Sequence, residues 1–380
     1  MSAPLGEQVG SSQAPGGALR RTRVLLFSAV VVVSAAAVAG YAAHAASRAK
    51  AAAAAGPLSV VPLDALPSLP SAASGQSAAS SALEGLGEGP YMLFRSTALG
   101  ETYGRVSLEG LEARNRQRFV TSLSCDRVHF AAGRGICLQA RRGVLTTYRA
   151  HVFDRNFTIA HSMALAGAPS RARMSSDGRL AAMTVFVTGH SYLSADFSTR
   201  TSIIDAASGK VIVDDLETMP VLREGVPVKA SDINFWGVTF ARRSGHFYAT
   251  LATEGKLYLV EGDLAARQMR VIHEDVECPS LSPDGTMVAF KRRVPAGGSG
   301  RLMWRLHVLE LASGKVTPLP AETRDVDDQV EWLGNREIVY ALPHDAPNAA
   351  ASTNSWALAI DGITPPRLLV ALAFSPAVVR

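Results

Sequence analysis

Two tight turns recur in this chain in the same order, and they restrict it to a repeated β architecture. The first turn precedes a short apolar run, Met287–Phe290 in the clear copy and Leu180–Met183 in the weaker copy. Its residues are Ser282, Pro283, Asp284 and Gly285 in the clear copy and Ser176, Asp177 and Gly178 in the weaker one. Proline presets φ, aspartate hydrogen-bonds its own backbone and glycine accepts a positive φ, so both segments predict a turn between two strands.

A second turn, Ala-Ser-Gly-Lys, follows the first at residues 207–210 and 312–315. Asp177 and Asp284 lie 107 residues apart, and Gly209 and Gly314 lie 105 residues apart. The two units therefore share one layout, which predicts a four-stranded meander with hairpin turns. Degenerate copies of the first turn are expected at residues 126, 244 and 335, so that successive copies lie 51, 67, 40 and 51 residues apart. Periods of about 40–50 residues with four strands each are typical of propeller blades.

The rest of the chain from Gly89 onward supports the same fold class. Short runs rich in Val, Ile, Phe, Tyr and Thr alternate with turn residues, and no helical period interrupts them. The hydrophobic fraction of 47% is sufficient for a core. We therefore expect residues 89–380 to form an all-β propeller, most simply of six four-stranded blades. The last strand, near residues 369–373, is expected to close the ring beside strands near Tyr91, because closure leaves no exposed sheet edge.

The segment before the propeller has a different composition. Residues 1–23 are polar, rich in Gly, Pro and Ser, and end in an arginine cluster, which predicts a disordered cytoplasmic tail. Residues 24–43 carry no charge and are long enough to cross a bilayer, since about 20 apolar residues suffice. By the positive-inside rule the arginines stay in the cytoplasm, which places the propeller outside. Residues 47–88, rich in Ala, Ser and Pro, predict a linker that tethers the propeller.

Two interpretations of residues 24–46 stay open. An uncleaved signal anchor would make the chain a single-pass protein of the cell membrane with an extracytoplasmic propeller, and the length of the apolar run favours it. A signal peptide cleaved after Ala43-His44-Ala45, an A-x-A-like site, would instead release a secreted propeller.

The three cysteines are Cys125, Cys137 and Cys278, and none forms a Cys-x-x-Cys pair, so a zinc site is not expected. Cys125 and Cys137 flank a predicted hairpin and could face each other across adjacent strands. Outside the cytoplasm they would form a disulfide, whereas in a reducing compartment they would remain two buried thiols. Cys278 is expected to be a small core residue.

Few segments carry a pattern that predicts chemistry. Residues 189–193 begin like a Gly-x-Ser-x-Gly nucleophile elbow, but the fifth residue is Leu193 and a polar segment follows. The segment is better interpreted as an extended loop, in which His190, Tyr192 and Phe197 are candidate binding residues. Two acidic clusters, at residues 274–277 and 325–331, predict solvated loops that lead into a blade, with metal binding as the lesser alternative.

Other classes of site and partner are not expected. The sequence contains no phosphate-binding loop, no dinucleotide fingerprint and no metal-ligand spacing among its histidines, so we predict no cofactor, no metal and no catalytic residue. Histidines inside predicted strands, such as His129, are expected to be structural. The formal charge is only +5, and no basic stripe with interleaved aromatics occurs, so nucleic acid is not the expected partner.

The segment Leu281–Phe290 resembles the repeat of the TolB-type propellers, which are exported six-bladed proteins. The resemblance covers roughly residues 89–370 at the level of the motif, with one clear copy. The apolar segment and the Ala-rich linker are similar to those of TolB-like translocation proteins of high-GC Gram-positive bacteria. The resemblance is specific to the fold and says little about function. The apolar segment, the linker, the repeat and the absence of a catalytic constellation together predict a monomeric, non-catalytic, extracytoplasmic propeller that binds a protein partner or a cell-envelope polymer. The alternative is a propeller hydrolase or lyase acting on envelope sugars or peptides, which predicts Asp, Glu or His side chains that converge in an open channel.

Overall fold

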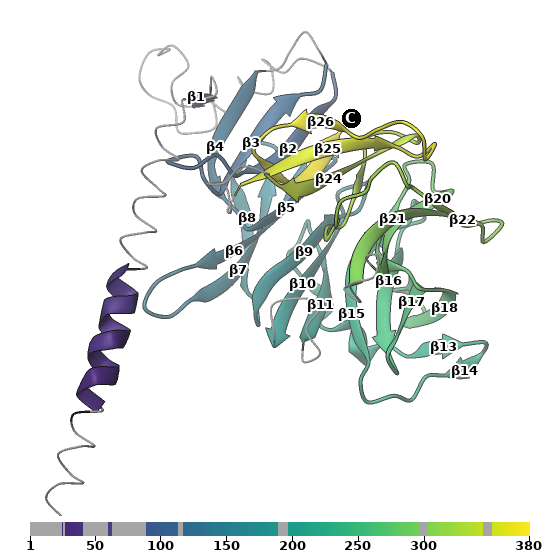
Figure 1. Cartoon of the computed structure of the whole chain (residues 1–380). Helices are drawn as coiled ribbons and strands as arrows, with labels where there is room; N and C mark the ends of the chain where they lie inside the picture. The colour runs from purple at the N-terminus through teal and green to yellow at the C-terminus, as the bar shows by residue number, and fades with distance from the viewer. Residues whose placement is uncertain are drawn as a thin grey trace, which may run out of the picture. The chain divides into compact units, whose positions relative to one another are not determined.

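A computed structural model of the chain describes residues 25, 27–40, 60–62, 89–112, 117–188, 197–295, 302–344 and 352–380. They fall into two compact units, Met1–Gly56 and Pro57–Arg380, each of which is described by itself. The first unit contributes one helical segment, and the second contributes a set of β-sheets (Figure 1).

The helical segment of the first unit covers residues 27–40. Within the described part of the chain, no helix combines the length and the apolarity that a membrane span requires. The prediction of a single-pass membrane anchor over residues 24–46, and with it of a membrane location through this helix, is therefore wrong.

The second unit is an all-β propeller of six blades, which confirms the fold predicted from the repeat (Figure 1). In each blade four antiparallel strands form a meander, and the innermost strand of each blade packs against the innermost strands of the neighbouring blades. Two blades carry additional edge strands.

The blades are numbered in chain order, and their strands are given from the inside outward. Blade 1 contains β27 (Ala373–Val379), β2 (Tyr91–Ser96), β3 (Arg105–Gly110) and β4 (Arg118–Ser124). Blade 2 contains β5 (Arg127–Ala131), β6 (Arg134–Arg141), β7 (Thr147–Asp154) and β8 (Ile159–Ala164). Blade 3 contains β9 (Ala168–Met174), β10 (Leu180–Thr188), β11 (Ser198–Asp205) and β12 (Val211–Val213).

Blade 4 contains β15 (Asn234–Phe240), β16 (His246–Thr253), β17 (Lys256–Asp263) and β18 (Gln268–Glu274). Blade 5 contains β19 (Glu277–Leu281), β20 (Met287–Pro295), β21 (Leu302–Glu310) and β22 (Val316–Pro318). Blade 6 contains β23 (Glu331–Trp332), β24 (Glu337–Pro343), β25 (Thr353–Ala359) and β26 (Arg367–Val370). The edge strands are β1 (Val60–Pro62) beside β4, and β13 (Val221–Arg223) and β14 (Val226–Pro227) beside β18. A 3₁₀ helix, Leu216–Thr218, precedes β13.

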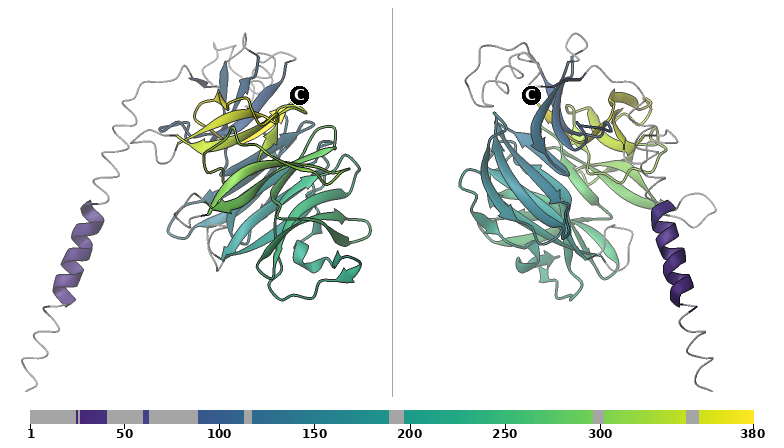
Figure 2. Two further views of the ribbon diagram at one scale, coloured as in Figure 1. Left: turned by 45° about the vertical axis from the view of Figure 1, so that its right-hand side comes forward. Right: turned by 90° about the vertical axis from the view of Figure 1, so that its left-hand side faces the viewer.

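The two ends of the propeller segment close the ring. The last strand, β27, pairs antiparallel with β2, in a register that sets Tyr91 opposite Val379 and Ser96 opposite Ala373. The yellow C-terminal strands accordingly lie beside the blue strands that begin the propeller, as three views agree (Figure 1, Figure 2). The closing strand begins at Ala373, a few residues beyond the predicted position, because residues 367–370 form the outer strand of blade 6.

The first recurring turn has the same side-chain hydrogen bonds in both copies. Ser282 Oγ donates to Asp284 Oδ1 at 2.6 Å and accepts from the Met287 amide at 3.0 Å. Ser175 makes the equivalent bonds to Asp177, at 2.5 Å, and from the Leu180 amide, at 2.8 Å. Ser175 is therefore the counterpart of Ser282, and Ser176 takes the place of Pro283. The glycines adopt the expected left-handed backbone, with φ of +68° at Gly178 and +79° at Gly285.

One degenerate copy of the turn lies elsewhere than predicted. Asp126 stands between β4 and β5, in the connection from blade 1 to blade 2. The corresponding hairpin turn of blade 2 is Ala132-Gly133, where φ is +45° and +79°. Positive φ at both central residues is typical of a type I′ turn, which needs neither serine nor aspartate. The signature used to find the repeat is therefore absent from this blade.

Strand direction alternates within each blade, so the connections divide between two faces of the propeller. One face carries the connections between the second and third strands and those between blades, and we call it the connection face. Among described residues it includes 97–104, 142–146, 254–255 and 319–330. The opposite face, the turn face, carries the remaining hairpin turns, including both recurring ones.

The hydrophobic core lies between neighbouring blades. Leu93, Val106 and Ala377 of blade 1 pack with Val128 and Phe130 of blade 2. Similar clusters join blades 2 and 3, blades 3 and 4, and blades 5 and 6. Because the sheets bury both of their faces, the innermost strands are largely buried, and their polar residues must find partners at the centre of the ring.

Candidate functional site

Charged side chains from several blades meet where the innermost strands come together. His129 lies on β5, Arg171 and Arg173 lie on β9, and Glu331 begins β23. The segment 319–330, which leads from β22 into β23, adds further acidic groups from the connection face. This group of residues, which we call the central ion network, is the part of the described chain where titratable side chains from different blades converge.

His129, Arg173 and Glu331 form the buried middle of the network. Glu331 Oε2 accepts a hydrogen bond from His129 Nε2 at 2.9 Å and an ion-pair contact from Arg173 Nη1. Arg173 also donates to the Val330 carbonyl at 2.9 Å. The Met174 amide donates to His129 Nδ1 at 3.1 Å. Because Nδ1 accepts, the imidazole proton is on Nε2, and the ring is held as one neutral tautomer.

The electrostatics of this trio fix its protonation. Burial alone would raise the pKa of Glu331, but the charge of Arg173 and the hydrogen bond from His129 outweigh it and lower the pKa to about 2. Burial, together with the charge of Arg173, lowers the pKa of His129 despite the opposing contact with Glu331. Near neutral pH the trio is therefore an ionised carboxylate, an arginine and a neutral histidine, and neither Glu331 nor His129 is poised to exchange protons.

A second group in the network surrounds Lys291, whose side chain is completely buried. Its Nζ lies 3.3 Å from Glu277 Oε1, forms an ion pair with Asp327, and sits 3.9 Å from the centre of the Trp304 ring. Trp304 Nε1 donates to Glu277 Oε2 at 2.9 Å. Burial would lower the pKa of Lys291, but the neighbouring negative groups raise it overall, so the ammonium stays charged.

The segment 319–330 connects the network to four blades. Asp328 accepts from Arg127 of blade 2 at 3.3 Å, and Asp327 accepts from Arg171 of blade 3 at 3.4 Å. The Gln329 amide donates to the carbonyls of Val238 and Pro279 in blades 4 and 5, at 3.0 and 2.9 Å. The acidic cluster predicted as a solvated loop therefore reaches the centre of the propeller. Asp327, Asp328 and Glu331 pair there with basic groups, and Asp325 accepts from the Trp304 amide at 2.7 Å.

Little space remains between these side chains. The cavity bounded by Arg127, His129, Arg171, Arg173 and Asp328, among others, has a volume of about 20 Å³. A cavity of this size holds about one water molecule. Asp, Glu and His side chains do converge here, as the enzyme alternative requires, but Asp327, Asp328 and Glu331 are paired with lysine and arginine. Within the described part of the chain, no group of three His, Cys, Asp or Glu side chains is arranged to hold a metal ion.

The predicted binding loop is only partly described. His190 and Tyr192 lie outside the described residues. Phe197 is half-buried and makes edge-to-face contacts with Phe186 and Trp236, at ring-centre distances of 6.3 and 5.3 Å. Phe197 therefore packs between blades 3 and 4, and the binding role of the loop stays a prediction.

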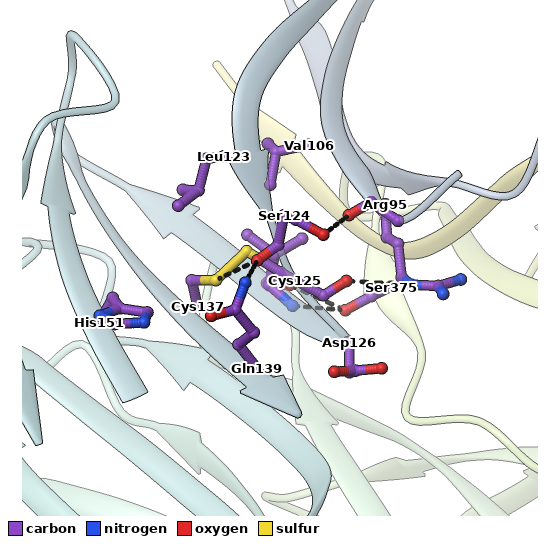
Figure 3. Close-up of a disulfide and its surroundings, with 12 residues drawn as sticks. Arg95, Val106, Leu123, Ser124, Cys125, Asp126, Cys137, Gln139, His151 and Ser375 are labelled. Carbon is purple, nitrogen blue, oxygen red and sulfur yellow. Dashed lines mark hydrogen bonds between the residues drawn. A yellow bond between two sulfur atoms is a disulfide. The ribbon is translucent and has the colours of Figure 1, made fainter. Parts of the chain in front are cut away.

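Cys125 and Cys137 form a disulfide that links the connection after β4 to strand β6 (Figure 3). Two hydrogen bonds beside the disulfide also help to hold blades 1 and 2 together. Gln139 of blade 2 donates to the Ser124 carbonyl at 2.9 Å, and Arg95 of blade 1 donates to the Cys125 carbonyl at 3.0 Å (Figure 3). Closing a loop of this length stabilises the fold by about 3 kcal/mol. Cys278 is a free, buried thiol in a cluster with Trp236 and Trp304.

Sequence reasoning missed the basic half of the central ion network, chiefly Arg127, Arg171, Arg173 and Lys291. One signal was present, since arginines two residues apart at 171 and 173 point to the same side of a strand. That side faces the centre only because β9 is the innermost strand of its blade. The sequence alone does not show which strand of a blade is innermost.

Comparisons with known proteins support the fold. No family model matches the chain, and no curated protein matches it. Among solved structures, TolB from Acinetobacter baumannii is similar with a TM-score of 0.50 and 15% identity, over 77% of this chain and 67% of that chain. A nidogen/laminin complex has a TM-score of 0.47 and 12% identity, over 77% and 98%. An oligogalacturonate lyase in complex with manganese has a TM-score of 0.42 and 10% identity, over 67% and 72%. At 15% identity the similarity to TolB establishes a TolB-like propeller fold and nothing about activity, and the two weaker similarities carry no argument.

Proposed function

We propose that this chain is a non-catalytic binding propeller, which recognises a protein partner or a cell-envelope component with its connection face. The observation that carries the proposal is the state of the central ion network. Arg173 holds Glu331 ionised, His129 is held neutral, and the cavity beside His129 and Arg173 has a volume of about 20 Å³. A centre of this kind stabilises the ring but leaves no room for a sugar or peptide, so recognition falls to the exposed connections.

We also propose that the chain works outside the cytoplasm. Disulfides persist in oxidising compartments and are rare in the cytosol. The bond between Cys125 and Cys137 supports such a compartment, independently of any membrane attachment.

Site-specific photo-cross-linking tests which face binds. A benzophenone amino acid would replace Tyr103 or Leu302 on the connection face, and Lys315 or Ile363 on the turn face; all four side chains are exposed. After irradiation with isolated cell envelopes, adducts are expected from the first two positions and not from the last two. Adducts from the turn-face positions alone would contradict the assignment of the face.

The enzyme alternative is tested in the same preparation. The purified chain would be incubated with envelope glycans and peptides, and soluble products would be measured. Turnover that is lost in a folded Glu331→Gln variant would overturn the non-catalytic proposal, because Glu331 would then act on substrate.

A further inference from the structure

The hairpin formed by β6 and β7 extends beyond its neighbours in blade 2. Its two strands remain paired up to Arg141 and Thr147. By contrast, β5 pairs with β6 only as far as Leu138, and β8 pairs with β7 only as far as Arg149. The end of the hairpin therefore projects as a two-stranded arm on the connection face (Figure 1).

Two aliphatic side chains occupy the apex of this arm. Val144 and Leu145 have relative exposures of 105% and 81%. The other residues from 141 to 147 are exposed as well, so no described residue of the propeller covers the apex. Single exposed apolar side chains are normal on a soluble protein, but an adjacent pair at the tip of a projecting hairpin is the arrangement of a contact surface.

The charge around the apex is predominantly positive. Arg141, Arg142 and Arg149 are all exposed, and the sequence contains no acidic residue from 127 to 153. The acidic group that reaches the arm is Asp126, which accepts from Arg142 at 3.2 Å and leaves that side chain 73% exposed. The apex is thus an apolar tip ringed by cations.

We infer that the tip of the β6–β7 hairpin binds reversibly to a lipid surface that carries anionic headgroups. Val144 and Leu145 would enter the boundary of the acyl chains, while the three arginines would lie at the level of the phosphates. This contact is peripheral, and it depends neither on the N-terminal helix nor on the proposed partner of the connection face.

The shape and chemistry of the apex favour a lipid surface over other anionic occupants. A soluble polyanion would engage the arginines but would leave Val144 and Leu145 in water. A specific protein complex buries about 800 Å² on each partner, from about 20–30 residues. A tip made of residues 141–149 is too small to supply that area, whereas shallow insertion into a bilayer needs only a few side chains.

A local fluorescence measurement on the full chain tests the inference. Leu145→Cys would be labelled with a nitrobenzoxadiazole dye, and Ile363→Cys on the turn face would serve as the matched control. Both positions are exposed, the other cysteines are bonded or buried, and neither variant should affect folding. The probes are vesicles of phosphatidylcholine with phosphatidylglycerol, and vesicles of phosphatidylcholine alone.

We expect a blue shift at position 145 with the anionic vesicles, and no shift there with neutral vesicles or at position 363. Each arginine near an anionic surface contributes about fivefold to partitioning. Adding Arg141→Glu and Arg142→Glu to the labelled Leu145→Cys protein should therefore weaken its partitioning to anionic vesicles by more than about 25-fold.

Unlabelled Val144→Ser/Leu145→Ser protein gives the second readout. A smaller fraction of this protein than of wild type should float with anionic vesicles, although its arginines are unchanged. Three outcomes would overturn the inference. The first is no shift at position 145, and the second is an equal shift at position 363. The third is that soluble polyphosphate displaces the wild-type protein and the Val144→Ser/Leu145→Ser protein from anionic vesicles equally well. The last outcome would identify a polyanion as the ligand, and a shift that requires an added protein would identify a protein partner.

Discussion

The central ion network and the β6–β7 hairpin are both rich in arginine, yet they use it in opposite ways. Arg173 is buried against Glu331 and His129, where its charge fixes the protonation of both neighbours. Arg142 touches one carboxylate, Asp126, and remains 73% exposed. The position of a strand within its blade therefore decides whether an arginine stabilises the ring or faces a partner. Inner strands pair their charges, and projecting hairpins present them.

The largest expected effect comes from exchanging one arginine in each region for methionine. Arg173→Met leaves the Glu331 carboxylate buried without its counter-ion, and breaking such a pair costs about 3–5 kcal/mol of unfolding free energy. Arg142→Met breaks an exposed pair, which is worth about 0–1 kcal/mol. Urea unfolding of both variants and of wild type measures the difference. Equal destabilisation by the two substitutions would contradict the distinction between a buried, structural arginine in the central ion network and an exposed arginine on the hairpin.

The disulfide at the base of the hairpin should give the next largest effect. Replacing Cys125 and Cys137 together by alanine removes a loop constraint and should lower the unfolding free energy by about 3 kcal/mol. A reductant should destabilise wild type by a similar amount and leave the double variant unchanged. Destabilisation of the double variant by reductant would show that another bond is responsible.

The pH dependence of stability tests the buried charge of Glu331. In the unfolded chain this carboxyl takes up its proton near its ordinary pKa of 4.5, whereas in the folded protein it stays ionised down to about 2. Acid therefore favours the unfolded chain, and about 2 kcal/mol of stability should be lost between pH 7 and pH 3 through this group. The lowered pKa of His129 acts in the same direction below pH 6.5.

The matched variant for this measurement is Glu331→Gln, which cannot titrate. It should be less stable than wild type at pH 7, but the gap should narrow by about 2 kcal/mol towards pH 3. A constant gap across this range would mean that Glu331 is not held ionised by Arg173.

The smallest effect is expected at the turn face, whose polar groups are partly solvated. Ser282→Ala and Ser175→Ala each remove the bond from serine to the turn aspartate and leave the following amide without its acceptor, at a cost of about 1 kcal/mol. Ser176→Ala should change stability by less than about 0.5 kcal/mol, because Ser176 is exposed and takes the place of Pro283. If Ser176→Ala costs as much as Ser175→Ala, the equivalence of the two turns is wrong.

The sequence was sufficient for features that depend on local chemistry. The Ser282–Gly285 turn carries its own hydrogen bonds, so its repetition predicts blades and their number. The first hairpin turn of blade 2 was predicted at the wrong position, because the actual turn, Ala132-Gly133, depends on backbone φ alone. The length of the apolar run before the linker predicts a membrane span, but no helix of the described chain is long and apolar enough for one.

The candidate site was less accessible to sequence reasoning, because it depends on distant residues meeting. His129, Arg173 and Glu331 are separated by 44 to 202 positions, and their contact follows from ring closure rather than from any local pattern. The acidic segment 325–331 was visible as a cluster, but its partners Arg127, Arg171 and Lys291 lie on three other strands. Only the assembled ring shows that Asp327, Asp328 and Glu331 pair with basic groups.

The central claim is that the buried charges hold the ring together while the connection face binds. Its most direct test is the affinity of folded Glu331→Gln protein for isolated envelopes, measured beside a Tyr103→Ser/Leu302→Ser variant. The account predicts that Glu331→Gln binds with wild-type affinity below its unfolding temperature, whereas the surface variant loses about tenfold or more. Loss of binding in folded Glu331→Gln, with the surface variant unaffected, would contradict it.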